Sequence, residues 1–500
     1  MKPSNELFIL IKSLTKSEKR YFKRFCKFYS NDKKNNYLKL FEAIDNQSIY
    51  DESKIKKKFR GEVFIKQLSV TKDYLNKIIL KSLNFYNSTN DPYILIKELI
   101  TEAELLINKK LYVQSWKKLQ RAKKLAYEYG YFYLVIESIG DERFLLNFLF
   151  KKEREDMQSE FEKEEKRIFY EIQNIREILG INQKVMKIVN SSGYLVTEEI
   201  NIKDLKIQIS FLEKLDPYKM LSINSKSLYY HTFIFANRSL SHHMICFRYS
   251  KELIDILESG GRTKNNDPTN YYWALHNYIM ASLRLGKLDE ARDGYSKLRV
   301  FLDSKEKFDT PRNVLEMRLN FIEVFLNLNM ALGNYNDCIE FIEKSIEPSE
   351  ITIENTQYFD EIALVVASTL FKICQYEESI VWLNKVSNCS QKRAIVDVSD
   401  ILIVLVHYEL GNFEIAETLI KRGIRKFRRG KGCGFEPVLL GNLEKILNTI
   451  DKDEIFLIFE VLDDSLQKYS DASSVKEILK RYYIFDWVKS KLRLKNSNII

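Results

Sequence analysis

Glycine and proline are both scarce in this chain of 500 residues, with 16 and 7 copies. An all-β protein of this length would need turn residues about every 8–12 positions, and so few glycines and prolines cannot supply them. Long helices joined by short turns need far fewer turn residues. The composition therefore favours an all-α fold.

Cysteines and long hydrophobic runs are also lacking. The six cysteines lie far apart and show no C-x-x-C spacing, which is typical of a reduced, intracellular protein. The longest apolar run, Ile401 to Val406, is far shorter than the roughly 18 residues of a membrane span. Lys12 interrupts the apolar stretch from Leu7 to Leu14, and no small-residue cleavage site follows it. We expect a cytoplasmic protein without a secretory signal.

Residue patterns that carry catalysis are missing as well. Neither a G-x-S-x-G elbow, nor an H-E-x-x-H pair, nor a dinucleotide-binding fingerprint occurs. Among the five histidines, His242 and His243 with Cys246 form the sole local group of possible metal ligands, and no second pair accompanies them. We interpret these three as turn and core residues. The sequence predicts that the chain is not an enzyme and binds neither a cofactor nor a metal.

One basic, glycine-rich segment runs from Arg428 to Gly434. Backbone amides in such a segment could hold a phosphate. The segment lacks the G-x-x-x-x-G-K-[ST] pattern, however, and follows a predicted helix and not a strand. We interpret it as a connection between helices, and it is the first place to look for a bound small anion.

A short pattern recurs in the second half of the chain: a large apolar residue, a turn residue, a polar residue, a large apolar or aromatic residue, two further residues and a small one. Apolar residues then continue at steps of three and four, as in a helix with one buried face. The turn residue often needs the left-handed conformation, which glycine adopts without a Cβ clash. Helix pairs in series are therefore predicted, each with an aromatic side chain filling the gap and a small residue allowing close approach. The copies are Leu285–Ala291, Leu332–Cys338, Ile373–Ser379 and Leu410–Ala416, with a weaker one at Lys110–Ser115.

The sequence Gly–x–aromatic–x–x–Ala at these turns resembles the centre of the tetratricopeptide repeat. Its positions here are Gly286, Ala291, Gly333, Tyr335, Tyr376, Gly411, Phe413 and Ala416. The turns at 286, 333, 374 and 411 are 47, 41 and 37 residues apart, longer than the family's repeat of about 34 residues. The family's Trp–Leu–Gly–Tyr pattern is absent, and Cys374 replaces one glycine. The resemblance implies a degenerate α-solenoid of helical hairpins.

Helix starts support this segmentation. Pro92, Pro217, Pro268, Pro311, Pro348 and Pro437 each follow Asp, Thr or Glu, which is typical of the first turn of a helix. Residues 151–180 are rich in charge, with Phe161, Ile168, Ile172, Ile175 and Leu179 at heptad-like steps. They predict a long helix, either an ordinary repeat helix or a protruding or coiled-coil one. Residues 190–201 are predicted to form a loop.

Four segments follow from these patterns. Residues 1–90 form a small basic helical domain, 91–265 a degenerate repeat region, 266–436 the clearest repeats and 437–500 a helical C-terminal cap. In this cap Asp451 with Glu454, and Ser474 with Glu477, resemble capping boxes. A terminal unit needs a polar outer face, and Lys476, Glu477, Lys480, Arg481 and Lys489 are predicted to supply it.

Positive charge is concentrated at the N-terminus. Residues 1–85 hold 20 Lys and Arg against nine Asp and Glu, a surplus of 11, while the whole chain has a net charge of +10. Thr15-Lys16-Ser17-Glu18 has capping-box form and opens an amphipathic helix, and three more helices are predicted near residues 37–44, 54–60 and 69–85. The candidate basic contact face comprises Lys16, Lys19, Arg20, Lys23, Arg24, Lys27, Lys56, Lys57, Lys58 and Arg60.

Two functions remain open from the sequence. A stack of hairpins offers a groove for a peptide or protein partner, so the leading hypothesis is a non-catalytic protein-interaction scaffold. The alternative is a regulator in which residues 1–85 bind nucleic acid and the repeats sense a peptide or protein. The basic face is also compatible with an acidic protein, a membrane surface or plain solvation. The partner and the oligomeric state are not determined.

Overall fold

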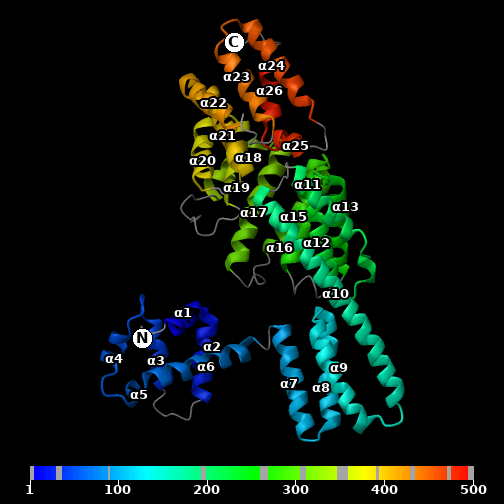
Figure 1. Cartoon of the computed structure of the whole chain (residues 1–500). Coiled ribbons are helices and arrows are strands. Elements are labelled where there is room, and N and C mark those ends of the chain that lie inside the picture. The colour runs from blue at the N-terminus through cyan, green and yellow to red at the C-terminus, as the bar shows by residue number, and fades with distance from the viewer. Residues whose placement is uncertain are drawn as a thin grey trace. The chain divides into compact units, whose positions relative to one another are not determined.

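The computed structural model describes residues 5–29, 36–87, 91–192, 199–259, 268–303, 311–345, 359–389, 393–427, 434–469 and 474–493. Every regular element in these ranges is a helix (Figure 1), which confirms the predicted all-α class. None of these helices combines the length and the apolar character that crossing a membrane requires. The chain divides into two units, residues 1–169 and 170–500, and the division falls inside helix α10 (Arg154–Ser192).

Unit 1 begins with a small cluster of helices around a core of Phe22, Leu40, Phe41 and Leu75. The capping box predicted at Thr15 is present: the Thr15 backbone N–H donates to Glu18, and the Glu18 N–H donates to the Thr15 hydroxyl. The prediction missed two helices, α1 and α5. The helices are α1 (Glu6–Ser13), α2 (Lys16–Tyr29), α3 (Asn36–Asp45), α4 (Glu52–Lys58), α5 (Val63–Lys66) and α6 (Leu68–Asn87).

The rest of unit 1 consists of α7 (Pro92–Asn108), α8 (Tyr112–Tyr129), α9 (Phe132–Leu149) and the first half of α10. Lys123 lies between Glu142 at 2.9 Å and Glu164 at 2.8 Å, so α8 is joined to α9 and α10. Helix α10 is 39 residues long and extends through Ser192, into the segment predicted as a loop. Its buried stripe departs from the prediction at Leu179, which is 43% exposed, while Ile178 and Ile181 are buried.

Unit 2 is a stack of helical hairpins. Helices α12, α15, α17, α19 and α21 each open a hairpin, and neighbouring members of this set pack on one another. We call the surface that they form the first-helix face. The hairpins are α12 (Ile223–Ser239) with α13 (His243–Ser259), α15 (Pro268–Arg284) with α16 (Leu288–Asp303), α17 (Pro311–Leu332) with α18 (Tyr335–Ser345), α19 (Phe359–Lys372) with α20 (Tyr376–Cys389), and α21 (Arg393–Glu409) with α22 (Phe413–Phe427); α11 (Glu199–Leu212) and a 3-10 turn (Pro217–Lys219) precede them.

Two core clusters meet within this stack, at α17. Helix α17 contributes Val324 and Leu328 to a cluster shared with α12–α16, and Leu326 to a second cluster shared with α19–α26. Each hairpin therefore buries its apolar stripe against the next one, as expected of a solenoid. Pro268 and Pro311 begin α15 and α17 as predicted, while Pro348 lies outside the described residues.

The predicted turns have one geometry. Gly286, Gly333 and Gly411 have φ of +71°, +78° and +72°, and Cys374 shares it at +64°. After each of them the next N–H donates to a carbonyl five residues earlier, as Lys287 does to Ser282 at 2.9 Å. This is the Schellman motif, which satisfies carbonyls at the end of the first helix. The same bond, from the His242 N–H to the Asn237 carbonyl at 3.0 Å, occurs after Ser241, a turn that the sequence pattern missed because serine stands in the glycine position.

A small buried residue stands five positions after each of these left-handed residues. Ala291, Cys338, Ser379 and Ala416 are all fully buried. Ser379 donates from its hydroxyl to the Ala367 carbonyl at 2.8 Å, which lies 12 residues earlier on the first helix. The small side chain thus brings the second helix within contact of the first helix's backbone, as the sequence predicted.

The aromatic residues in the turns are less enclosed than predicted at two positions. Tyr335 and Phe413 are 45% and 53% exposed, although the Phe413 ring still lies 5.9 Å from that of Tyr408 on α21. Tyr376 is half-buried and lies against Phe371 with ring centroids 5.9 Å apart. Because the small residue already closes the hairpin, the aromatic ring at the start of the second helix is left at the edge of the contact.

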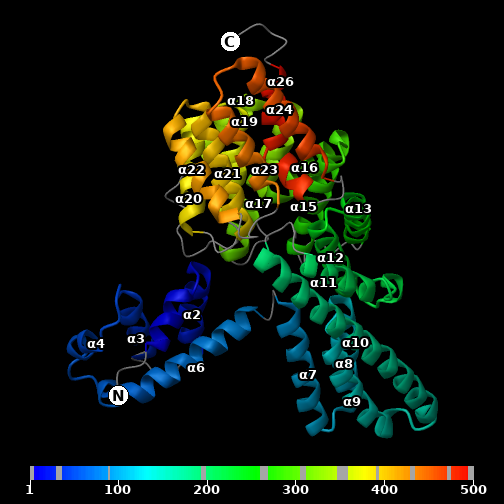
Figure 2. The same cartoon turned by 45° about the horizontal axis from the view of Figure 1, so that its top comes forward.

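The chain ends with α23 (Glu436–Leu447), α24 (Lys452–Gln467), α25 (Ser474–Arg481) and α26 (Ile484–Arg493). Figure 2 shows these orange and red helices against the stack. They pack over the ends of first helices: Asp486 pairs with Lys372, the last residue of α19, at 2.9 Å, and Trp487 donates to Glu409, the last residue of α21. Glu477 and Arg481, predicted on a polar outer face, are instead 9% and 8% exposed.

Candidate functional site

The predicted basic face is divided between two helices. On α2, Lys16, Arg20, Arg24 and Lys27 are exposed. Lys19 is held by Asp45 at 2.7 Å and Lys23 by Glu42 at 3.1 Å, both on α3. These two lysines therefore contribute to packing between α2 and α3, and the exposed basic side chains of α2 are the other four.

The remaining basic residues belong to α4 and its C-terminal turn. Lys57, Lys58 and Arg60 are exposed, while Lys56 pairs with Glu52 one turn earlier at 2.8 Å. Helix α3 packs against both α2 and α4. The ten residues thus form two basic groups, one on each of these helices.

The other chemical groups noted in the sequence have local partners. His242 shares a hydrogen bond with Asn237 at 2.9 Å, and the Cys246 thiol donates to the Ile234 carbonyl at 3.5 Å. Burial raises the pKa of that thiol to about 12. Residues 428–433 of the basic, glycine-rich segment lie outside the described residues. In the segments that the structure describes, no group of three potential metal ligands occurs.

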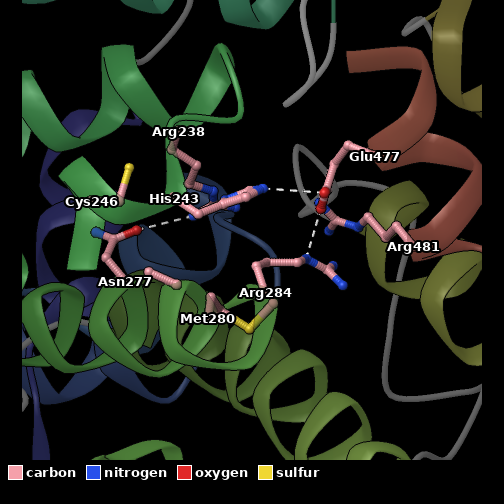
Figure 3. Close-up of a pocket in the computed structure, with 9 residues that line it drawn as sticks. Arg238, His243, Cys246, Asn277, Met280, Arg284, Glu477 and Arg481 are labelled. Carbon is pink, nitrogen blue, oxygen red and sulfur yellow. Dashed lines mark hydrogen bonds and ion pairs between the residues drawn. The ribbon is translucent and has the colours of Figure 1, made fainter. Parts of the chain in front are cut away.

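A cluster of charged side chains, which the sequence did not reveal, lies where the first-helix face of unit 2 meets the start of the second helix α13. Its centre is the carboxylate of Glu477 on α25. Arg284, the last residue of α15, approaches this carboxylate at 2.7 Å, and His243, the first residue of α13, approaches it at 3.1 Å. Figure 3 shows the side chains of three helices meeting at this carboxylate. Arg238 donates to Asn277 at 3.2 Å beside them.

A second pair completes the cluster one helical turn further along α25. Arg481 donates to Glu323 of α17, and both side chains are buried. His276 lies 3.8 Å from the same carboxylate, beyond hydrogen-bonding distance. Glu361 of α19 contributes a further favourable charge toward Arg481. Helix α25 thus presents an acidic and a basic residue to two oppositely charged positions on the first-helix face.

The pKa shifts of the clustered residues agree with ion pairs that are charged at neutral pH. Burial alone would raise the pKa of Glu477, but Arg284 and the hydrogen bond with His243 bring it down to about 2. For Glu323, too, burial is outweighed by Arg481, and the pKa falls well below its usual range. Burial lowers the pKa of His276, so its ring is neutral at pH 7. The cluster therefore holds charged carboxylates against charged guanidinium groups.

The cluster still has unused hydrogen-bonding capacity. Arg284 Nη2 and Arg481 Nε are buried and have no hydrogen-bond partner among the described residues. A cavity of about 30 Å³ lies between Arg238, Met280 and the α25 side chains, enough for only one or two water-sized groups. The site as it stands is nearly filled by α25 itself.

Comparisons with known proteins give a weak structural likeness. No protein family and no curated protein matches the sequence. A solved structure, that of NprR in complex with its cognate peptide NprX, matches at 16% sequence identity with a TM-score of 0.37, over 73% of this chain and 94% of that chain.

A larger pocket of about 290 Å³ lies between α20, α21, α22 and α23. Its charged groups are already matched to one another: Lys426 lies 2.8 Å from Asp400 and 2.6 Å from Asp397. Of the described residues, only those of α20 to α23 line this pocket, whereas the α25 cluster joins residues up to 234 positions apart. We therefore regard the α25 cluster as the candidate binding site.

A partial signal for the cluster exists in the sequence. Polar residues such as Asn277, Arg284 and Glu323 occur in first helices that are otherwise strongly apolar. Their partners could not be identified from the sequence, because they lie far away along the chain, as Arg481 lies 158 positions after Glu323, and charged residues are abundant throughout.

Proposed function

We propose that this chain is a non-catalytic interaction protein that holds a peptide or a helix of a protein partner on the first-helix face of unit 2. One observation carries the proposal: helices α13, α15 and α17 already hold a short helix, α25, by its charged side chains. A groove that receives one face of an amphipathic helix is a recurring mode of peptide recognition.

The buried ion pairs of the site are better suited to selecting a partner helix than to stabilising the fold. Burying charges requires desolvation, and a well-packed apolar replacement of a buried ion pair is often equally stable or more so. Apolar residues lie close to Glu323 and Arg481 in the sequence, yet the contact of Arg481 with α17 is an ion pair. Charged pairs instead restrict which helix fits, because a mismatched partner leaves a buried charge without compensation.

The chemistry of the site favours binding over catalysis. The Cys246 thiol, with a pKa near 12, is protonated at neutral pH, so it is a poor nucleophile. The carboxylates of Glu323 and Glu477 have depressed pKa values, and weak bases of this kind accept protons poorly at pH 7.

The proposal is tested by differential capture with the tagged full chain. Arg284→Gln removes one cation of the site, and Arg292→Gln removes an exposed cation of α16 as the matched control. We expect quantitative mass spectrometry to identify a protein whose recovery falls at least tenfold with Arg284→Gln and is unchanged with Arg292→Gln. Equal recovery with both variants, each folded by circular dichroism, contradicts the proposal.

A second candidate function is favoured by the exposed residues of α2. Lys16, Arg20 and Arg24 are spaced four residues apart and Lys27 follows three later, so all four share one side of the helix. Such a basic stripe suits a phosphate backbone. We propose nucleic-acid binding through α2 as this alternative, in which unit 2 senses the peptide or protein.

A further inference from the structure

The partner chemistry of the first-helix face follows from the segment that occupies it. We infer that α25 is a displaceable ligand within the chain, and that its site takes a partner helix with an acidic residue followed one turn later by a basic residue. This inference rests on the proposed function of the first-helix face.

First, α25 has the features of a bound peptide. It is eight residues long, well below the length at which an isolated helix is stable in water. Ile478 and Leu479 are buried in the core, and Glu477 and Arg481, four residues apart, lie on neighbouring turns of one side. Its helical form therefore depends on what it contacts.

Second, the surface that contacts α25 carries two positions of opposite charge. Arg284 forms a cationic position for Glu477, and His243 contacts the same carboxylate at 3.1 Å. Glu323, with Glu361 nearby, forms an anionic position for Arg481. Withdrawal of α25 would remove the main counter-charge of each position and leave Glu323 with only the smaller contribution of Arg238. An apolar helix, or one of a single charge sign, cannot compensate both of them, so the surface selects a helix with both charges in this order.

Third, the fit of α25 is incomplete. Arg284 Nη2 and Arg481 Nε lack hydrogen-bond acceptors among the described residues, and a cavity adjoins them. Tyr483, which links α25 to α26, has φ of +60°, a conformation that is strained for a bulky residue. A partner helix free of this link, with one more acceptor facing Arg284, would satisfy the site better than α25 does.

Fourth, α25 is anchored from one end by a helix that is held independently. Helix α26 is fixed by Asp486 on Lys372 and by Lys491 and Trp487 on Glu409. These contacts do not involve Glu477 or Arg481. Helix α25 can therefore leave the site while α26 keeps its place on the stack.

The test uses a fluorescent peptide of residues 470–484 and a matched peptide in which Glu477 and Arg481 exchange places. The receptor is the full chain, as wild type and as the variant Glu477→Ala/Arg481→Ala, in which α25 has lost its charged anchors. We expect the native peptide to bind the variant at least tenfold more tightly than the wild type, and the exchanged peptide to bind neither. Adding Arg284→Gln to the variant should abolish binding of the native peptide.

Each contrary result is decisive. Failure of the native peptide to bind the folded variant, or equal binding of the exchanged peptide, overturns the inference. If the variant does not fold, hydrogen exchange on the wild type decides: amides of α25 should exchange at least tenfold faster than those of α15 and α26, and equal protection overturns the inference. The proposed function still holds after such a failure if capture remains sensitive to Arg284→Gln. If capture is not sensitive to Arg284→Gln, the proposed function and the inference are both wrong.

Discussion

Arg481 donates a hydrogen bond from its guanidinium to the carboxylate of Glu323, which lies 158 residues earlier in the chain. Both groups are buried. The bond joins the short helix α25 to the centre of the hairpin stack, at α17, where the two core clusters meet.

Removing one member of this pair should cost more than removing both. Glu323→Leu leaves the Arg481 guanidinium buried without its main counter-charge, and we expect the free energy of unfolding to fall by about 3–5 kcal/mol. The double variant Glu323→Leu/Arg481→Leu should recover most of that loss. Urea denaturation of the wild type, Glu323→Leu, Arg481→Leu and the double variant completes a double-mutant cycle, and strictly additive losses would show that the pair is not coupled.

The Glu477 ion pairs should make stability depend on acidity. Because the pKa of Glu477 falls from the ordinary 4.5 to about 2 on folding, its contribution is full above pH 5 and disappears as the pH falls toward 2. We expect Glu477→Gln to be less stable than the wild type at pH 7 and the difference to shrink below pH 4. Thermal denaturation between pH 7 and pH 3 measures it; a constant difference contradicts the pairing.

Close approach of α22 and α23 should make Gly423 intolerant of a side chain. A Cβ at Gly423 would lie 2.6 Å from Leu440 Cδ1, whereas one at Gly441 meets nothing within 4 Å. We expect Gly423→Ala to lower the free energy of unfolding by about 1–3 kcal/mol. Gly441→Ala, also in a helix, should raise stability by up to about 1 kcal/mol. Equal effects in denaturant titrations would refute the close contact.

The left-handed turns should respond in opposite directions to opposite substitutions. Cys374 has φ of +64° with a side chain present, so Cys374→Gly should relieve strain and stabilise the chain by up to about 1 kcal/mol. Gly333→Ala, at φ of +78°, should destabilise it by about 1 kcal/mol. Melting temperatures that shift in the same direction for both would show that the turns are not conformationally restricted.

Nucleic-acid binding through α2 predicts a specific dependence on salt. The variant Lys16→Gln/Arg20→Gln/Arg24→Gln/Lys27→Gln should bind DNA or RNA more weakly, with a slope of log K against log salt that is reduced by about one per lost contact. A control with Lys57→Gln/Lys58→Gln on α4 should keep most of the slope. Fluorescence anisotropy at several salt concentrations measures both, and no binding by the wild type at low salt eliminates this function.

Local features of the fold could be predicted from the sequence. The turns at Gly286, Gly333, Cys374 and Gly411 were found because a helix ends where a residue adopts positive φ, and a small residue five positions later is needed for close approach. Both requirements act within a dozen residues, so they leave a pattern in the sequence. The Ser241 turn obeys the same rule and was missed only because its residue type is unusual there.

The candidate site could not be found in this way. With 79 Lys and Arg and 69 Asp and Glu in the chain, charge complementarity allows many pairings, and Glu477 and Arg481 were assigned to an exposed cap. Tertiary packing decided otherwise, because Ile478 and Leu479 draw α25 into the core and carry the two charges with them. The sequence alone determined helices, turns and the hairpin stack through short-range sterics and periodicity. Only the folded chain decided which distant charges meet, because burial of apolar surface sets that choice.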